Sequence, residues 1–265
     1  MSNQPVVLTS VSGAMDGAFT AIADVSAALR QSSGRSQHRL IGGLAVILHV
    51  QRLGLDLPMR ATGDADFGVP PYVLQEPELV DTIEDLGYHK VAGNRWERAL
   101  ENRRTASVDL LIPSYRTRVR DTARIGTVTT TEVPGLAEAL QGPGIPIEAE
   151  LYLTDDSRLT ATTLLPDALG MLTLKVLART VRAETRDVGD IWRCLEIAAA
   201  DNVQPDSFDD TPTRQQVRTL LWRELGPNGK ALTDLPAGMS EQQAAKLRTR
   251  TRALLTECVG AESPR

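Results

Sequence analysis

The sequence is poor in aromatic residues and in cysteine, and both shortages exclude particular kinds of site. Phe, Trp and Tyr make up 4% of the 265 residues, so a surface on which nucleic-acid bases stack against aromatic rings is not indicated. The two cysteines, Cys194 and Cys258, fall in helical-looking segments without the spacing of metal ligands, and the three histidines are scattered. Neither a zinc site nor a disulfide-stabilised scaffold fits this pattern.

The chain also lacks a long apolar run and an excess of positive charge. No segment approaches the length needed to cross a bilayer, and the first residues do not combine a basic region with an apolar core. We therefore expect a cytoplasmic protein without a membrane partner. The net charge of -5 argues against broad electrostatic coating of nucleic acid, so such a partner must be held by a local basic patch.

What the sequence does contain is a pair of aspartates separated by one small residue, within the stretch RATGDADFGV at 60–69. Asp64 and Asp66 are predicted in a turn that feeds a short strand, where alternate side chains share a face. Two ionised carboxylates so close repel each other, and a divalent cation is the simplest way to neutralise them. Alternatively, the sequence Gly-Asp-Ala-Asp is typical of a turn, in which the Asp side chains accept hydrogen bonds from nearby backbone amides.

Two other stretches favour the metal interpretation. Gly42 and Gly43 follow a short apolar segment and precede an apolar run with a helical pattern. The two glycines predict a sharp turn at the start of a helix, where a phosphate can bind backbone amides that no side chain covers. Asp109 is the one charge in the apolar, strand-like run 106–113, and a buried charge must be paired or bound to a metal. It is therefore a candidate third ligand beside Asp64 and Asp66; an Asp in water at a strand edge is the alternative.

A basic stripe follows in the last third of the chain. Charged residues recur every three or four positions, which predicts one face of a single helix with apolar residues opposite. The stripe consists of Lys175, Arg179, Arg182, Arg186, Asp190 and Arg193. Lys175 is the first candidate for a contact to nucleotide phosphates, because a compact ammonium can follow the charge as pyrophosphate leaves. A solvated face, with Asp187 and Asp190 in ordinary helix salt bridges, is the alternative.

A second group of basic residues surrounds Asp109 in the sequence. Its members are Arg103, Arg104, Arg116, Arg118, Arg120 and Arg124. Such a group can track an RNA backbone toward a metal site. Ordinary solubilising charge explains it equally well.

Strand patterns dominate the first part of the chain and helical patterns the last. We expect strands at 6–9, 39–41, 96–100, 107–112, 126–133, 147–153 and 159–164, and helices at 17–30, from the Gly-Gly turn to 53, and at 77–86, 213–225 and 240–258. The stretch 142–146 predicts a break, and Ser240 with Gln243 predicts a capping box. The order indicates an α+β fold, with a mixed-sheet core domain in 1–165 and a helical domain in 166–265.

These features together resemble the nucleotidyltransferase superfold of DNA polymerase beta. Within it, the chain resembles the AbiEii/AbiGii toxin group, also called MenT-type, the toxin half of bacterial toxin–antitoxin pairs. The resemblance spans about residues 38–200. The residues on which it rests are Gly42, Gly43, the run Arg60-x-Thr62-x-Asp64-x-Asp66, Asp109, and the segment 165–198, which contains a Lys, an Arg and a basic-Asp-x-x-Asp run. One departure is the gap between Gly43 and Asp64, which is longer than in the wider superfold.

The resemblance implies an enzyme that transfers a nucleoside monophosphate from a nucleoside triphosphate to the 3′ end of a tRNA. Translation would be blocked until a cognate antitoxin intervenes. Implied catalytic residues are Asp64, Asp66, Lys175, Asp109 and Asp190, with Asp187 as the alternative to Asp190. The three aspartates Asp64, Asp66 and Asp109 would hold two Mg²⁺ ions. Implied nucleotide contacts are Gly42, Gly43, Arg60, Thr62, Lys175, Arg179, Arg186 and Asp187. Transfer to a protein or small molecule, and a degenerate binding module without chemistry, remain the alternatives.

Overall fold

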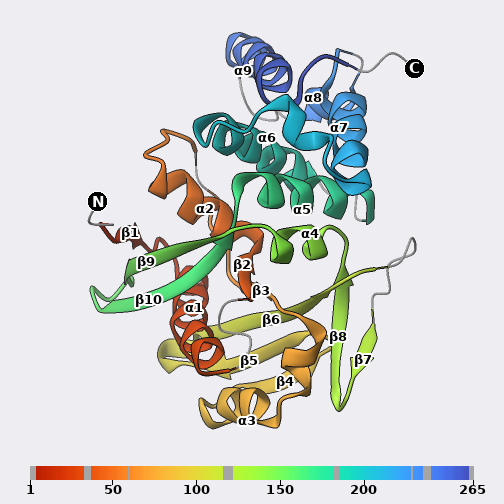
Figure 1. Ribbon diagram of the computed structural model, residues 1–265. Helices are drawn as coiled ribbons and strands as arrows, with labels where there is room; N and C mark the ends of the chain where they lie inside the picture. The colour runs from red at the N-terminus through yellow and green to blue at the C-terminus, as the bar shows by residue number, and fades with distance from the viewer. Residues whose placement is uncertain are drawn as a thin grey trace. The chain divides into compact units, whose positions relative to one another are not determined.

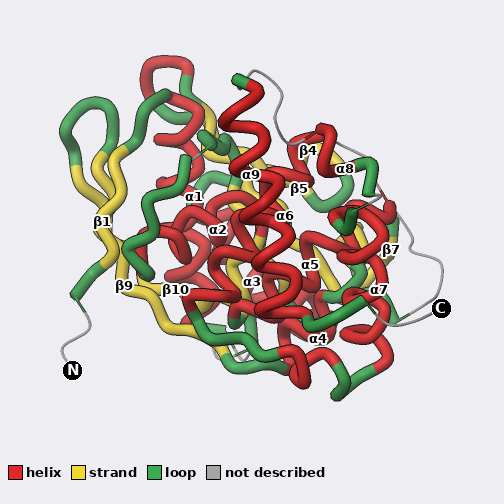
Figure 2. The backbone as a smooth tube through the Cα atoms, turned by 90° about the horizontal axis from the view of Figure 1, so that it is seen from above, coloured by secondary structure: helices red, strands yellow, loops and turns green. Residues whose placement is uncertain are grey.

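Figure 1 shows the computed structural model of the chain, which describes residues 4–32, 37–58, 60–115, 122–181, 185–227, 229–234 and 240–262. The chain forms two compact units, Met1–Asp167 and Ala168–Arg265. Strands are confined to the first unit among these residues, and from residue 168 on every described regular element is helical (Figure 2). The predicted α+β class is confirmed.

The larger sheet of the first unit mixes parallel and antiparallel pairs. Its strands follow the order β2 (Arg39–Ile41), β3 (Ala65–Gly68), β6 (Thr105–Pro113), β5 (Arg95–Ala99) and β4 (His89–Ala92), while β8 (Val128–Val133) pairs with both β6 and β7 (Ala123–Ile125). The pairs β3–β6 and β6–β8 are parallel, whereas β2–β3 and β5–β6 are antiparallel. This mixed sheet confirms the expected core and brings β3 beside β6.

The smaller sheet joins strands from both ends of the first unit, in the order β1 (Val6–Thr9), β9 (Gly144–Tyr152) and β10 (Arg158–Pro166). The predicted break at 142–146 is wrong in its last part, because β9 already begins at Gly144. Pro146 pairs with Leu164 of β10, whereas the pairing of β9 with β1 runs over Ala149–Tyr152. Proline is tolerated there because that side of β9 behaves as a sheet edge.

Helices cover the sheets of the first unit and connect their strands. They are α1 (Gly13–Gln31), α2 (Gly42–Arg52), α3 (Pro77–Asp85) and α4 (Leu136–Gln141), with short 3₁₀ turns at Pro71–Gln75 and Glu101–Arg103. Helix α1 begins four residues before its predicted start, because the Ser12 side chain caps it by accepting a hydrogen bond from the Met15 amide. It contacts β6 and β10 through a fully buried face that includes Phe19 and Ile22.

The second unit consists of helices around its own apolar core. They are α5 (Ala168–Val181), α6 (Thr185–Ala200), α7 (Pro212–Leu225), α8 (Ala231–Asp234) and α9 (Glu241–Leu254), with a 3₁₀ turn at Pro205–Phe208 and a π-helical turn at Leu255–Val259. The capping box of Ser240 and Gln243 is confirmed at the start of α9. Among the described residues, none of these helices has both the length and the hydropathy that a membrane span requires.

The prediction of one continuous helix carrying the basic stripe is wrong. The stripe is divided between α5 and α6, which pack against each other. The ammonium of Lys175 lies 2.8 Å from a carboxylate oxygen of Asp190, although 15 residues separate them in sequence. In one straight helix that separation would span about 22 Å. Arg182 and the side chain of Arg186 lie outside the described part of the chain.

Candidate active site

Strand pairing brings the candidate residues of the first unit into one row across the larger sheet. Ile41 of β2 is opposite Asp66 of β3, Asp66 is beside Asp109 of β6, and Asp109 is opposite Arg95 of β5. Directly paired residues on neighbouring strands present their side chains to the same face. Asp64 precedes β3 and lies two residues before Asp66, so it follows the same alternation.

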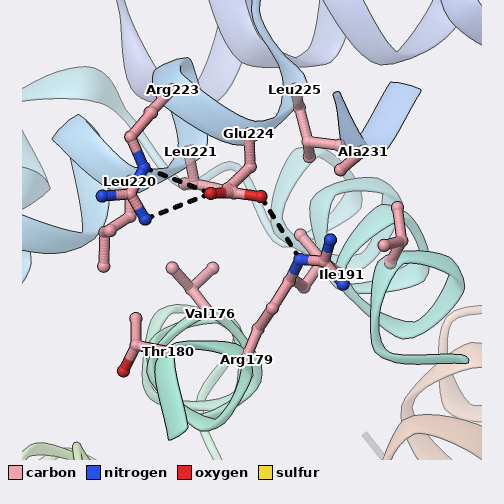
Figure 3. Close-up of a pocket in the computed structure, with 11 residues that line it drawn as sticks. Val176, Arg179, Thr180, Ile191, Leu220, Leu221, Arg223, Glu224, Leu225 and Ala231 are labelled. Carbon is pink, nitrogen blue, oxygen red and sulfur yellow. Dashed lines mark hydrogen bonds and ion pairs between the residues drawn. The ribbon is translucent and has the colours of Figure 1, made fainter. Parts of the chain in front are cut away.

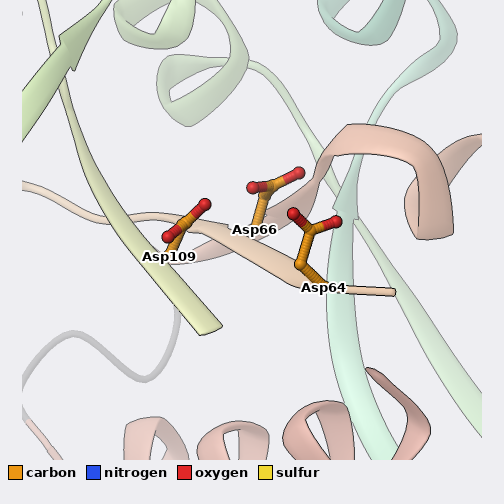
Figure 4. A group of neighbouring side chains, drawn as sticks. All are labelled: Asp64, Asp66 and Asp109. Atoms are coloured by element: carbon orange, nitrogen blue, oxygen red, sulfur yellow. The ribbon is translucent and has the colours of Figure 1, made fainter. Parts of the chain in front are cut away.

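The three aspartates converge as expected. One carboxylate oxygen of each of Asp64, Asp66 and Asp109 lies within 4.8 Å of the others. Figure 4 shows the three carboxylates on the same side of the two strands. Asp109 is buried, whereas Asp64 and Asp66 are half-buried, so one side of the cluster remains open to a ligand.

Arg95 supplies positive charge to this cluster and was not among the predicted residues. Its Nε lies 3.1 Å from Oδ1 of Asp109, and its Nη2 donates to Asp109 Oδ2 at 2.9 Å and to Asp64 Oδ2 at 2.8 Å. The hydrogen bonds to Asp109, and then the charges of Asp109 and Asp64, raise the pKa of Arg95 despite partial burial. Its guanidinium is therefore a permanent cation that holds two of the three carboxylates.

Helix α2 starts directly beside the cluster, and Gly42 makes that start possible. Its φ of +74° lies in the left-handed region that favours glycine, and a Cβ at this position would lie 1.9 Å from Oδ2 of Asp66. The residue that caps α2 is Ile41, whose side chain cannot accept a hydrogen bond from the first-turn amides. The bare amide end of α2 therefore reaches the carboxylate of Asp66 without an intervening side chain.

Thr62 and Arg60 lie against the next glycine of this turn. A Cβ on Gly43 would lie 3.2 Å from the Thr62 hydroxyl oxygen and 3.4 Å from a guanidinium nitrogen of Arg60. The Thr62 hydroxyl donates to Asp64 at 3.2 Å. The structure thus brings together the predicted Gly42, Gly43, Arg60 and Thr62 with the aspartates, all within the first unit.

These residues fit a divalent cation by the chemistry of their donors. Carboxylate oxygens are the hard ligands that Mg²⁺ prefers in proteins, and they usually hold it with water and substrate phosphates. The guanidinium of Arg95 already bridges Asp64 and Asp109, so this position accommodates positive charge.

In the second unit, Lys175 and Asp190 form a buried ion pair. Their side chains are 7% and 5% exposed, and Asp190 also accepts a hydrogen bond from Arg193 at 3.2 Å. Asp187 is buried as well. The alternative of a solvated basic face is therefore wrong at Lys175, Asp187 and Asp190, whereas the ordinary helix salt bridge that it included is found between Asp190 and Arg193. Burial raises the pKa of the neighbouring Cys194 thiol to about 12.

Arg179 lines a hollow of about 130 Å³ within the second unit. Figure 3 shows its guanidinium directed at Glu224 of α7, which also pairs with Arg223. The Nε of Arg179 lies 3.4 Å from that carboxylate. The remaining walls include Val176, Ile191 and Leu221, so the Arg179 side chain joins two helices across an apolar hollow.

The second basic group is partly a structural feature. Arg104 donates to the buried Asp16 at 2.8 Å and to Asp155 at 3.2 Å, which contradicts a role of its guanidinium in tracking RNA. Arg103 and Arg124 are exposed. Arg116, Arg118 and Arg120 lie outside the residues that the structure describes.

Comparisons with known proteins leave the family open. No family model matches the chain, and no curated protein matches it. Among solved structures, an antigenic nucleotidyltransferase-like protein from Paracoccidioides brasiliensis is similar, with a TM-score of 0.45 and 14% sequence identity, covering 86% of this chain and 96% of that chain. A similarity at this level assigns no chemistry, and the function must be argued from the residues of this chain.

Proposed function

We propose that this chain is a metal-dependent nucleotidyltransferase that transfers a nucleoside monophosphate from a nucleoside triphosphate to an acceptor hydroxyl. The observation that supports it is the convergence of Asp64, Asp66 and Asp109 within 4.8 Å of one another, beside the bare amide end of α2. The carboxylates suit Mg²⁺ and the amide end suits phosphate. Joined at one site, the two features suit the Mg²⁺ complex of a triphosphate.

Asp64, Asp66 and Asp109 would hold two Mg²⁺ ions. When bound, these ions neutralise the charge of the triphosphate and lower the pKa of the attacking hydroxyl. The chain's own contribution is to position the reactants, because phosphoryl chemistry of this kind depends mainly on alignment and charge. Gly42 and Gly43 leave the first-turn amides accessible to phosphate oxygens, and Arg60 and Thr62 flank them.

The roles of the second unit remain predictions. We propose residues 1–165 as the nucleotidyltransferase core domain and 166–265 as a helical domain that contributes nucleotide contacts. Lys175 is the proposed phosphate contact, and Asp190 is its positioning partner at 2.8 Å. Arg179, Arg186 and Asp187 are the further proposed contacts. The alternative in which Asp187 rather than Asp190 is the functional acid stays open.

The proposed acceptor is the 3′ end of a tRNA in the cytoplasm, and the proposed setting is a toxin–antitoxin pair of the AbiEii/AbiGii (MenT-type) group. This part of the proposal is supported by the resemblance carried by Gly42, Gly43, the Arg60–Asp66 run, Asp109 and Lys175. A neighbouring reading frame that encodes a small antitoxin would support it further.

Incubation of the protein with each labelled ribonucleoside triphosphate and total tRNA tests the proposal. We expect label on tRNA with Mg²⁺ and none with EDTA. Label on a protein or a small molecule would redirect the proposal to another acceptor. No label anywhere would indicate a degenerate binding module.

The variant Asp66→Asn tests the site itself. It keeps the shape of the side chain but removes one metal-binding charge, so we expect transfer to fall by about 100-fold or more. The melting temperature without metal should stay within a few degrees, because asparagine keeps an oxygen beside the first turn of α2 and the loss of one charge reduces repulsion within the cluster. The matched control is Asp85→Asn, an exposed aspartate at the end of α3. Full activity in Asp66→Asn would place the site elsewhere.

A further inference from the structure

Arg95 occupies the cluster in the way that a bound cation would. Its guanidinium makes a two-pronged contact with Asp109 and extends one nitrogen to Asp64, at 2.8 to 3.1 Å. These carboxylates belong to two different chain segments, and they are two of the three that a metal ion bound at the cluster would share. The guanidinium therefore offsets part of the negative charge of the cluster, through Asp64 and Asp109.

A guanidinium and a divalent cation cannot hold these oxygens together at full strength. Each hydrogen bond from Arg95 occupies one lone pair of Asp64 or Asp109 and lowers the negative charge that this carboxylate offers to a metal ion. In addition, the two cations repel each other across a few ångströms in a partly buried site. Binding of the metal must weaken the contact between Arg95 and the cluster.

The Arg95 side chain is able to move away. It is 39% exposed, and Asp64 is 36% exposed, so the contact between these two groups lies at the open side of the cluster. Its partner Asp109 is only 12% exposed and is fixed within β6. Rotation of the arginine side chain toward solvent frees Asp64 without moving β5.

We propose that Arg95 is an internal competitor for the divalent cation: its guanidinium neutralises Asp64 and Asp109 until the metal displaces it from the cluster. The competition sets the concentration of divalent cation at which the site fills. This inference rests on the metal site of the proposed function, but not on which group is transferred or to what acceptor.

The test compares Mn²⁺ binding by Arg95→Met, Arg95→Lys and wild type, measured as free Mn²⁺ by electron paramagnetic resonance. We expect Arg95→Met to bind Mn²⁺ about tenfold or more tightly, because a repelling charge and a competing donor are lost. The metal-free variant should melt below wild type, and Mn²⁺ should raise its melting temperature by more than it raises that of wild type. Arg95→Lys, which lacks the planar fork, should lie between the two.

The matched control is Arg98→Met on the same strand. Arg98 lies three residues along β5 and pairs with Asp24 at 2.7 Å, so it projects from the opposite face. Its loss should leave Mn²⁺ affinity unchanged even if it lowers stability.

The outcomes separate this inference from the proposed function. If wild type binds Mn²⁺ and Arg95→Met and Arg95→Lys bind it equally or more weakly, Arg95 supports the site rather than competing, and the inference is overturned alone. If none of the proteins binds Mn²⁺, the metal site and the inference fall together. If Arg95→Met does not fold, an affinity of Arg95→Lys at or below that of wild type overturns the inference.

Discussion

Asp16 keeps its charge in the interior of the first unit. The side chain is fully buried on α1, and it accepts hydrogen bonds from Arg104 at 2.8 Å and from the amide and hydroxyl of Thr154 at 3.0 and 2.5 Å. Burial alone would raise the pKa of Asp16, but hydrogen bonds from Ser10, Thr154 and Arg104 outweigh it and lower the pKa to about 2. The charge is therefore part of the packing between α1 and the loop after β9.

We predict that Asp16→Asn lowers the free energy of unfolding of the first unit by about 3 kcal/mol at pH 7, because it leaves Arg104 without its buried counter-charge. The control is Asp155→Asn, which removes the exposed partner of the same arginine and should lower the free energy of unfolding by much less, because solvent screens this ion pair. Denaturant titrations followed by circular dichroism measure both. Similar losses in the two variants would contradict this role of Asp16.

The same aspartate predicts a pH dependence with a definite sign. Its folded pKa is lowered from 3.8 to about 2, so its stabilisation is fully present above pH 3.8 and is lost as the pH falls through 2. The shift corresponds to about 2 kcal/mol. Wild type should lose this amount between pH 4 and pH 2, whereas Asp16→Asn should not.

The acidic residues of the site could be predicted from the sequence, whereas their counter-ion could not. Asp64 and Asp66 share a face by simple alternation, and a charge in the apolar run around Asp109 requires a partner. Arg95 was missed because the predicted strand began at residue 96, one position too late. The register of the β5–β6 hairpin, which places Arg95 opposite Asp109, depends on the turn between these strands, and sequence patterns fix such turns only approximately.

At the scale of elements, the packing of α1 on the larger sheet depends on one close approach. A Cβ on Gly17 would lie 1.9 Å from the carbonyl oxygen of Thr105 at the start of β6. This contact is between backbones, so no side-chain rotation can relieve it.

We predict that Gly17→Ala destabilises the first unit by about 2 kcal/mol despite the higher helix propensity of alanine, because α1 must move away from β6. The control is Gly13→Ala on the same helix, where the nearest atom to a Cβ is Cγ of the Arg104 side chain at 3.3 Å. That variant should change the free energy of unfolding by less than about 1 kcal/mol. Thermal unfolding of both proteins measures the difference, and an unchanged midpoint in Gly17→Ala would contradict the close approach.

Elements with local start and stop residues were predictable, and those decided by packing were not. β1 is found at the predicted residues 6–9, and α9 begins at its capping box. The stripe from Lys175 to Arg193 was predicted as one helix because its charged residues recur every three or four positions, and two helices packed side by side can carry the same recurrence. The short β4, whose residues are mostly exposed, has no apolar alternation and was missed.

At the scale of the whole molecule, many basic side chains are used inside the units. Arg104 is paired with acids of the first unit, and Arg179 and Arg193 with acids of the second. These pairs reduce the charge that is available to a nucleic acid on a protein whose net charge is already -5.

Both cysteines lie in the second unit, and they make its stability measurable by itself. Cys194 and Cys258 are buried, and burial raises the pKa of their thiols to about 12 and about 11. Since the thiolate is the reactive form, labelling by a thiol reagent requires the surrounding helices to open.

We predict that Lys175→Met accelerates labelling of both cysteines by about 100-fold, because it removes the ammonium from the buried Asp190 and costs about 3 kcal/mol. Labelling follows the open population when reclosing outpaces the reagent, a condition that a series of reagent concentrations verifies. The control is Lys246→Met, an exposed lysine of α9, whose labelling rate should match that of wild type. Equal labelling rates in Lys175→Met and wild type would mean that the ion pair between Lys175 and Asp190 does not stabilise the second unit.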